Sequence, residues 1–156
     1  MCIRDSGWPI KEATHCFERT RPLAPPASCE EAADVLDPVI EYPNMSVHRE
    51  GSKVDVTGVG TAVVGAVMQR HGEPANLNNH LLFADWSLDF RKPSGQLFTA
   101  PESATAPWEF EQVATFDSRM VGLVQDTDNR KYVLTNENFG PYGSTGKVWL
   151  LKFNQK

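Results

Sequence analysis

Short apolar or alternating segments, separated by turn residues, recur along the chain from residue 37 to its end. Alternation with a period of two is typical of half-buried strands, and Gly, Pro, Asn and Asp between the segments are typical of turns. The segment 61–68 is almost entirely apolar, so we expect a strand that is buried on both faces. The predicted strands are 38–42, 53–57, 61–68, 80–86, 95–100, 108–116, 120–124, 131–135 and 147–153.

This succession of short strands without a helix of useful length predicts an all-β fold. A sandwich, a barrel and a propeller share this spacing, and the pattern alone does not separate them. A strict repeat of propeller length is not visible in the sequence. A weak repeat exists, because the strand ending Phe83-Ala84-Asp85 and the strand leading to Asp126 both finish in Asp before a turn.

The segment 7–37 has a different composition and predicts an irregular loop. Pro22, Pro25 and Pro26 exclude a regular helix or central strand there. Ser28 is a candidate N-cap for one helical turn over 29–34. Cys16 and Cys29 lie in this loop and predict one disulfide, which indicates an oxidising compartment, either the periplasm or the exterior. Two unrelated free thiols are the alternative.

Residues 1–6, Met-Cys-Ile-Arg-Asp-Ser, are interpreted as a translated sequencing adapter, because the codons ATG TGT ATA AGA GAC AG match a common transposon-end adapter. A genuine amino terminus is the alternative. On the adapter interpretation, Cys2 takes no part in the fold, and 7–156 form one domain.

Charge and hydropathy narrow the function classes. The formal net charge is −5, so we expect no nucleic-acid partner. No apolar run approaches the roughly 20 residues of a membrane-spanning helix, so we expect no membrane span.

A series of segments resembles, in the same order, segments of the secreted glucose/sorbosone dehydrogenases. They include Gly7-Trp8-Pro9 with Cys16, the strand-like Asp37 to Pro43, and Gly95-Gln96-Leu97-Phe98. The other matching segments are 62–70, 77–86, 121–135 and 143–150. Asn129 stands where the family has Gly, and Asn tolerates the left-handed backbone next best after Gly.

The resemblance implies a six-bladed β-propeller, of which this chain is the carboxy-terminal part: the last blades plus the irregular disulfide-bearing loop. It also implies the cofactor pyrroloquinoline quinone (PQQ), a calcium ion that orients it, and an aldose substrate oxidised at its anomeric carbon. In the family the catalytic His and the calcium ligands come from earlier blades, so we expect no catalytic residue and no metal ligand in this chain.

Later blades of the family supply basic side chains to the quinone carboxylates. The nearest candidates here are Arg91, Lys92 and Arg119. The loop that carries Arg91 and Lys92 is longer than in the family, and Arg119 is about one position out of register, which turns a strand side chain to the opposite face. Solvated surface side chains are the alternative interpretation of all three.

Two other functions are compatible with the same scaffold. A non-catalytic propeller that binds protein or glycan, as in hedgehog-interacting relatives, would need no quinone site. A propeller lactonase would need a carboxylate-rich metal centre, and the sequence shows none.

Overall fold

The computed structural model describes residues 10–21, 26–29, 35–44, 58–140 and 142–153. The chain divides into two compact units. The first consists of Met1–Glu41 with Thr105–Pro107, and the second consists of Tyr42–Ala104 with Trp108–Lys156. The adapter interpretation of 1–6, the helical turn over 29–34 apart from Cys29, and the predicted strand 53–57 lie outside the described residues.

The first unit is held together by a disulfide and by polar contacts. A two-residue turn joins β1 (Lys11–Glu12) to β2 (His15–Cys16), and the turn residue Ala13 has a φ of 55°. Cys16 is bonded to Cys29, with the Cα atoms 5.7 Å apart, which confirms the predicted disulfide. Glu41 accepts hydrogen bonds of 2.9 Å from both the backbone N–H and the hydroxyl of Thr14.

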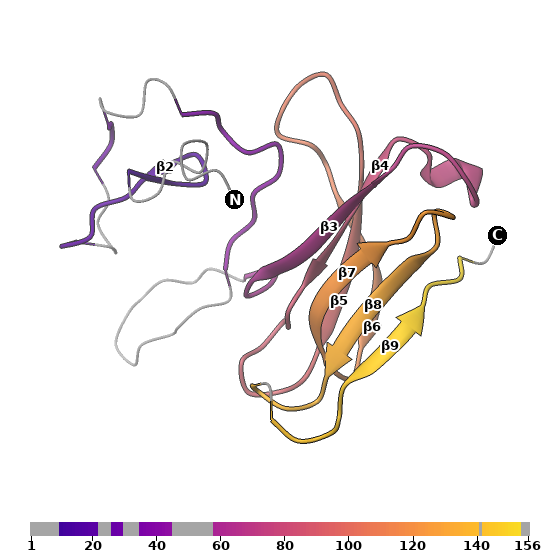
Figure 1. Ribbon diagram of the computed structural model, residues 1–156. Coiled ribbons are helices and arrows are strands. Elements are labelled where there is room, and N and C mark those ends of the chain that lie inside the picture. The colour runs from indigo at the N-terminus through magenta and orange to yellow at the C-terminus, as the bar shows by residue number, and fades with distance from the viewer. Residues whose placement is uncertain (1–9, 22–25, 30–34, 45–57, 141, 154–156) are drawn as a thin grey trace. The chain divides into compact units, whose positions relative to one another are not determined.

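The second unit contains two antiparallel sheets (Figure 1). The first has the order β3-β4-β5-β6, and the second has the order β7-β8-β9, so each sheet pairs only strands that are neighbours in the chain. The strand bounds are β3 Val63–Gln69, β4 His80–Asp85, β5 Gly95–Pro101, β6 Glu111–Phe116, β7 Arg119–Gln125, β8 Lys131–Asn136 and β9 Lys147–Leu150. A short 3-10 helix, η2 (Ala75–Leu77), lies between β3 and β4.

The two sheets bury one apolar core between them. Leu82, Ala84 and Leu97 of the first sheet form one cluster with Met120, Leu123 and Val133 of the second. Gly65 allows the close approach of β3 to β7, because a Cβ added there would lie 2.8 Å from the backbone nitrogen of Leu123. The described part of the chain is therefore all-β, as predicted, and neither sheet closes on itself.

Four strand predictions differ from the structure, and one of them, 147–153, ends already at Leu150. Residues 38–42 form no strand, although Asn44 just beyond them makes a parallel bridge to Gly60. The predicted strand 108–116 begins only at Glu111. The segment 61–68 is not buried on both faces, because β3 is an edge strand in which Val63 is 57% exposed.

Within the described residues no helix is long and apolar enough to cross a membrane.

Candidate functional site

The loops at one end of the two sheets bring the predicted basic residues together. Arg91 and Lys92 lie in the connection from β4 to β5, and both are exposed. Arg119 opens β7 and donates a hydrogen bond of 3.2 Å from Nη2 to the carbonyl of Phe90, the residue directly before Arg91. Arg119, which is distant in the sequence from Arg91 and Lys92, therefore belongs to the same group of loops, which we call the Arg119 loop cluster.

Arg119 is buried rather than solvated. Only 5% of the residue is exposed, and its Nη1 donates a hydrogen bond of 2.6 Å to the carbonyl of Glu137 in the β8–β9 connection. Its guanidinium carbon lies 5.0 Å from the ring centre of Trp86 and 5.6 Å from that of Phe139. Stacking on aromatic rings suits the planar, weakly hydrated guanidinium. Arg119 thus joins the β4–β5 and β8–β9 connections.

One donor of Arg119 is left over. Its Nε is buried and has no hydrogen-bond partner among the described residues. The side chain also forms no ion pair within that part of the structure. Among the described residues, the positive charge of Arg119 is thus met by carbonyl dipoles and aromatic faces and by no carboxylate.

The backbone of the cluster is tied by polar contacts around Ser87. The Ser87 hydroxyl oxygen lies 2.8 and 3.0 Å from the carbonyl oxygens of Asp89 and Lys92, so its single O–H can donate to either. It also accepts the N–H of Ser94 at 3.0 Å. These bonds give the long connection a defined shape and leave the Arg91 and Lys92 side chains exposed.

Exposed aromatic rings surround the Arg119 loop cluster. Phe90 is 42% exposed, Phe139 is 60% exposed and Tyr142 is 61% exposed. Trp86 packs against Phe90 and Phe139, with ring centres 5.6 and 5.3 Å apart. Chemically, the cluster combines flat apolar faces with positive charge, which suits an anionic aromatic compound or a sugar.

A buried carboxylate fixes the end of β4 beside this cluster. Asp85 is fully buried and accepts N–H bonds from Thr61 at 3.0 Å, Ala62 at 2.9 Å and Ser87 at 3.0 Å. The Tyr42 hydroxyl donates a fourth hydrogen bond of 2.6 Å. Burial, followed by this hydrogen bond and the charge of Asp85, raises the pKa of Tyr42 well above its ordinary value.

Sequence reasoning did not identify Asp85 as a hydrogen-bonding centre. The available signal was an acidic residue at the end of an otherwise apolar strand, which is rarely buried unless it is satisfied by donors. Gly60 was also missed as its neighbour. A Cβ added at Gly60 would lie 2.4 Å from the Asp85 carboxylate, so this position has no room for a side chain.

The turn after β7 matches its prediction. Asn129 has a φ of 61°, the left-handed conformation expected where the resembling family has Gly. Asp126 accepts N–H bonds of 2.9 Å from both Asp128 and Arg130. Desolvation alone would raise the pKa of Asp126, but hydrogen bonds from Arg130, Tyr132 and Asp128 hold it below its ordinary value.

Metal ligands do not gather in the described residues. No three His, Cys, Asp or Glu side chains within that part of the chain are placed to hold a metal ion.

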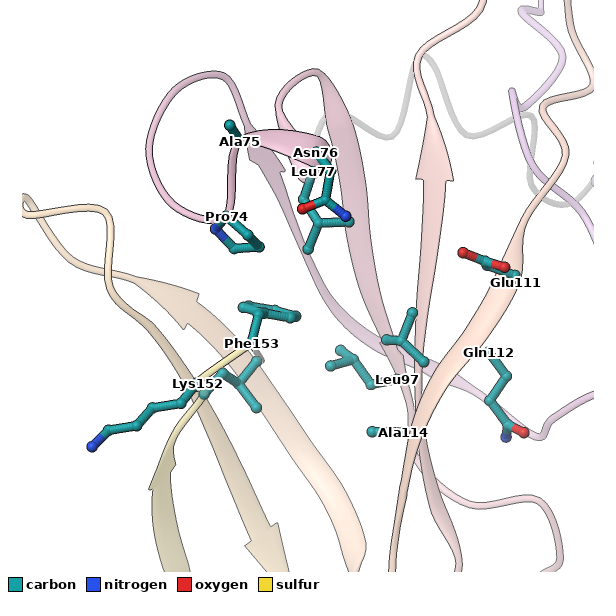
Figure 2. Close-up of a pocket in the computed structure, with 12 residues that line it drawn as sticks. Pro74, Ala75, Asn76, Leu77, Leu97, Glu111, Gln112, Ala114, Lys152 and Phe153 are labelled. Carbon is teal, nitrogen blue, oxygen red and sulfur yellow. The ribbon is translucent and has the colours of Figure 1, made fainter. Parts of the chain in front are cut away.

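An open groove of about 840 Å³ lies elsewhere in the second unit, between β6 and the segment that follows β9. Figure 2 shows Phe153 facing Pro74 and Leu77, with Leu97 and Ala114 at the floor and Lys152 directed away. Its lining combines these apolar side chains with polar ones, among them Glu111, Gln112 and Lys152.

Comparison of the chain with protein-family models, with curated proteins and with solved structures finds no match.

Proposed function

We propose that the chain supplies the closing sheets of an exported six-bladed β-propeller, and that the whole protein is a PQQ-dependent dehydrogenase that oxidises the anomeric carbon of aldose sugars. The proposal rests on the ordered resemblance of segments from Gly7 to Leu150 to the glucose/sorbosone dehydrogenases. The observation that carries it furthest is a four-stranded meander followed directly by a second antiparallel sheet packed on its face. Blades of a propeller have this form.

The disulfide supports export. A bond between Cys16 and Cys29 is compatible with a periplasmic or extracellular protein, where oxidising conditions preserve it.

The exposed cations fit the carboxylates of PQQ. When bound, PQQ accepts a hydride from the sugar while a base takes the hydroxyl proton, which yields a lactone and the reduced quinone. Arg91 and Lys92 would bind the carboxylates, because both are exposed on a loop of defined shape and can form charge-assisted hydrogen bonds. Arg119 would hold that loop in position and contribute charge from behind it.

The described residues do not fit calcium. Because no suitable group of acidic side chains gathers there, we assign the calcium site to other parts of the protein. The resemblance, in which the catalytic His comes from an earlier blade, assigns the base there as well.

The test is dye-coupled oxidation of glucose and other aldoses by the natural full-length protein, supplied with PQQ and calcium. An Arg91→Ala/Lys92→Ala variant should bind PQQ about a hundredfold or more weakly, because each of the two lost charge-assisted hydrogen bonds contributes about 1.5–3 kcal/mol. Lys152→Ala, at an exposed site outside the cluster, is the matched control. A full-length protein that oxidises none of several aldoses would contradict the proposal.

A glycan-binding propeller without catalysis is the second candidate. It is favoured by the exposed rings of Phe90, Phe139 and Tyr142 beside the cluster, since exposed aromatic faces stack on sugars. Glycan binding that is lost in Phe139→Ala, together with no dye reduction, would favour this function over the dehydrogenase.

A further inference from the structure

The two sheets of the second unit share one irregularity in strand pairing. In the first sheet, the pairing of β3 with β4 shifts register between Val63 and Gly65. In the second, the pairing of β7 with β8 shifts between Met120 and Gly122. Each irregularity falls near the start of the first strand and ends at a glycine, which is the third residue of β3 and the fourth of β7, so we match Gly65 with Gly122.

This correspondence extends across the strands. Gly65 pairs with Ala84, which pairs with Leu97. Gly122 pairs with Leu134, which pairs with Val148. The next row on the same face runs Val67, Leu82 and Thr99 in the first sheet. Its counterpart in the second sheet runs Val124, Tyr132 and Leu150.

The face of the first sheet that contacts the second sheet corresponds to the face of the second sheet that points away from the first. Leu82, Ala84 and Leu97 face the second sheet and form the core with Leu123 and Val133. Because side chains alternate along a strand, the neighbours of Leu123 and Val133 lie on the opposite face of the second sheet. We call that surface the outer face. It corresponds to the face with which the first sheet packs on the second. Its residues are Gly122, Val124, Tyr132, Leu134, Val148 and Leu150.

The contacting face of the first sheet is covered, whereas the outer face of the second sheet is exposed among the described residues. Leu82, Leu97 and Thr99 are each exposed by 1% or less. Val124, Val148 and Leu150 are 48%, 69% and 45% exposed. None of these six residues on the outer face is charged, which is unusual for a strand face that remains in water.

Gly122 leaves room on the outer face for a strand to cross it closely. At Gly65, an added Cβ would lie 2.8 Å from the backbone of Leu123, because the first strand of the next sheet passes directly over the glycine. At Gly122, an added Cβ would meet only Leu134 of its own sheet, at 3.7 Å. The site for a crossing strand is present at Gly122, and no described residue occupies it.

We infer that this outer face binds a third antiparallel β-sheet of the same polypeptide, whose first strand crosses over Gly122 as β7 crosses over Gly65. This inference rests on the propeller architecture proposed above, and it identifies the surface through which the chain joins the rest of the ring. The interface is apolar and commits Tyr132, Leu134 and Val148 to contact the incoming sheet.

A second copy of this chain does not offer the surface that a crossing like that at Gly65 requires, which is the inner face of a sheet equivalent to the second one. The complementary face of its second sheet, with Met120, Leu123 and Val133, is already buried against its own first sheet. The corresponding face of its first sheet carries Phe83 and Phe98, which are covered by the rings of Tyr42 and Phe110 at 5.6 to 6.2 Å. An additional sheet is therefore the occupant that fits.

The test uses the natural protein, with its reading frame extended to its own start and stop codons. Val148→Cys and Thr127→Cys are labelled with a maleimide under native conditions, and the labelled peptides are quantified by mass spectrometry. Both positions are exposed in the described chain. We expect Val148→Cys to react about tenfold or more slowly than Thr127→Cys, because the third sheet covers it.

A pair of glycine variants provides a second readout. Gly65→Leu and Gly122→Leu should each lower the melting temperature of the extended protein by about 5 °C or more, because both obstruct a strand crossing. A destabilising Gly65→Leu with a neutral Gly122→Leu, or equal labelling of Val148→Cys and Thr127→Cys, would overturn the inference. Labelling of Val148→Cys that accelerates on dilution would assign the face to a second copy and also overturn it. Protection of Val148 in a protein that oxidises no sugar would keep the third sheet and reject the dehydrogenase.

Discussion

The phenolic oxygen of Tyr42 lies 2.6 Å from a carboxylate oxygen of Asp85, whose other hydrogen bonds come from the backbone of Thr61, Ala62 and Ser87. This single carboxylate fixes the entry to β3 and the end of β4 together. Because the Arg119 loop cluster begins at the next residue, Trp86, the placement of the cluster depends on Asp85.

Asp85→Asn should lower the free energy of unfolding by about 2 kcal/mol. The amide places an N–H₂ group where one carboxylate oxygen accepted the N–H of Ala62, and a buried donor without a partner costs about 1–3 kcal/mol. Urea unfolding measures the change. Asp128→Asn, at an exposed turn, is the control and should change stability by less than about 0.5 kcal/mol. Equal stabilities for the two variants would show that the Asp85 bonds contribute little.

The pH dependence of stability should carry the signature of Tyr42. Its pKa is raised in the folded protein, so above about pH 10 the unfolded chain releases the phenolic proton while the folded chain retains it. The Tyr42 contribution to stability is therefore constant below pH 10 and decreases as the pH rises above it. The measurement is the difference in unfolding free energy between the wild type and Tyr42→Phe from pH 8 to 11. A difference independent of pH throughout would contradict the raised pKa.

Replacing Arg119 should loosen two connections at once. Arg119→Lys removes the guanidinium group, whose two Nη atoms donate to the carbonyls of Glu137 and Phe90. It also weakens the stacking on Trp86. The expected loss is about 2 kcal/mol, since hydrogen bonds to charged groups contribute about 1.5–3 kcal/mol. Hydrogen exchange should increase in both 87–94 and 137–146.

Arg130→Lys is a suitable comparison for that variant, because Arg130 makes surface ion pairs with Asp126 and Asp128. Such pairs contribute about 0–1 kcal/mol, so its exchange pattern in the two connections should match that of the wild type. Unchanged exchange in Arg119→Lys would show that the connections hold their shape without it.

Loss of the disulfide should affect the first unit alone. Cys16 and Cys29 are 13 residues apart, and closing a loop of about 15 residues stabilises a fold by about 3 kcal/mol in the chain-entropy model. Cys16→Ser/Cys29→Ser should therefore increase hydrogen exchange in 10–21 and leave that of β3 to β9 unchanged. Cys2→Ser is the control. Equal effects on both units would contradict the division of the chain into two units.

The strands that depend on local pattern were predictable. The segments 80–86, 95–100, 120–124 and 131–135 coincide with β4, β5, β7 and β8 within one or two residues. Their apolar residues alternate between two faces, and turn residues bound them. The Cys16–Cys29 bond was also confirmed, because it follows from the chemistry of cysteine. Asn129 is left-handed, as expected from the Gly that stands there in the resembling family.

The errors have a common physical cause, which is packing between distant segments. Tyr42 and Phe110 both lie in segments with a strand-like pattern, yet each leaves the strand conformation. Their rings instead cover Phe83 and Phe98 on the face of the first sheet. Alternation along the sequence reports that these rings are buried, but not which surface buries them.

The candidate site was predicted only in part. Arg91, Lys92 and Arg119 do meet at one group of loops, but the burial of Arg119 between Trp86 and Phe139 was not predicted. A basic residue at a strand start is normally solvated, and only the tertiary placement of the two aromatic rings changes that expectation. Whether Arg91, Lys92 and Arg119 bind a quinone stays a prediction.

Both sheets are meanders in which every strand pairs with its immediate neighbour in the chain. Such pairings need only short stretches of polypeptide to meet, so the entropy lost on closing each loop stays small. The protein can accordingly build its layers in the order in which they occur along the chain, each finished sheet offering the surface on which the next one condenses.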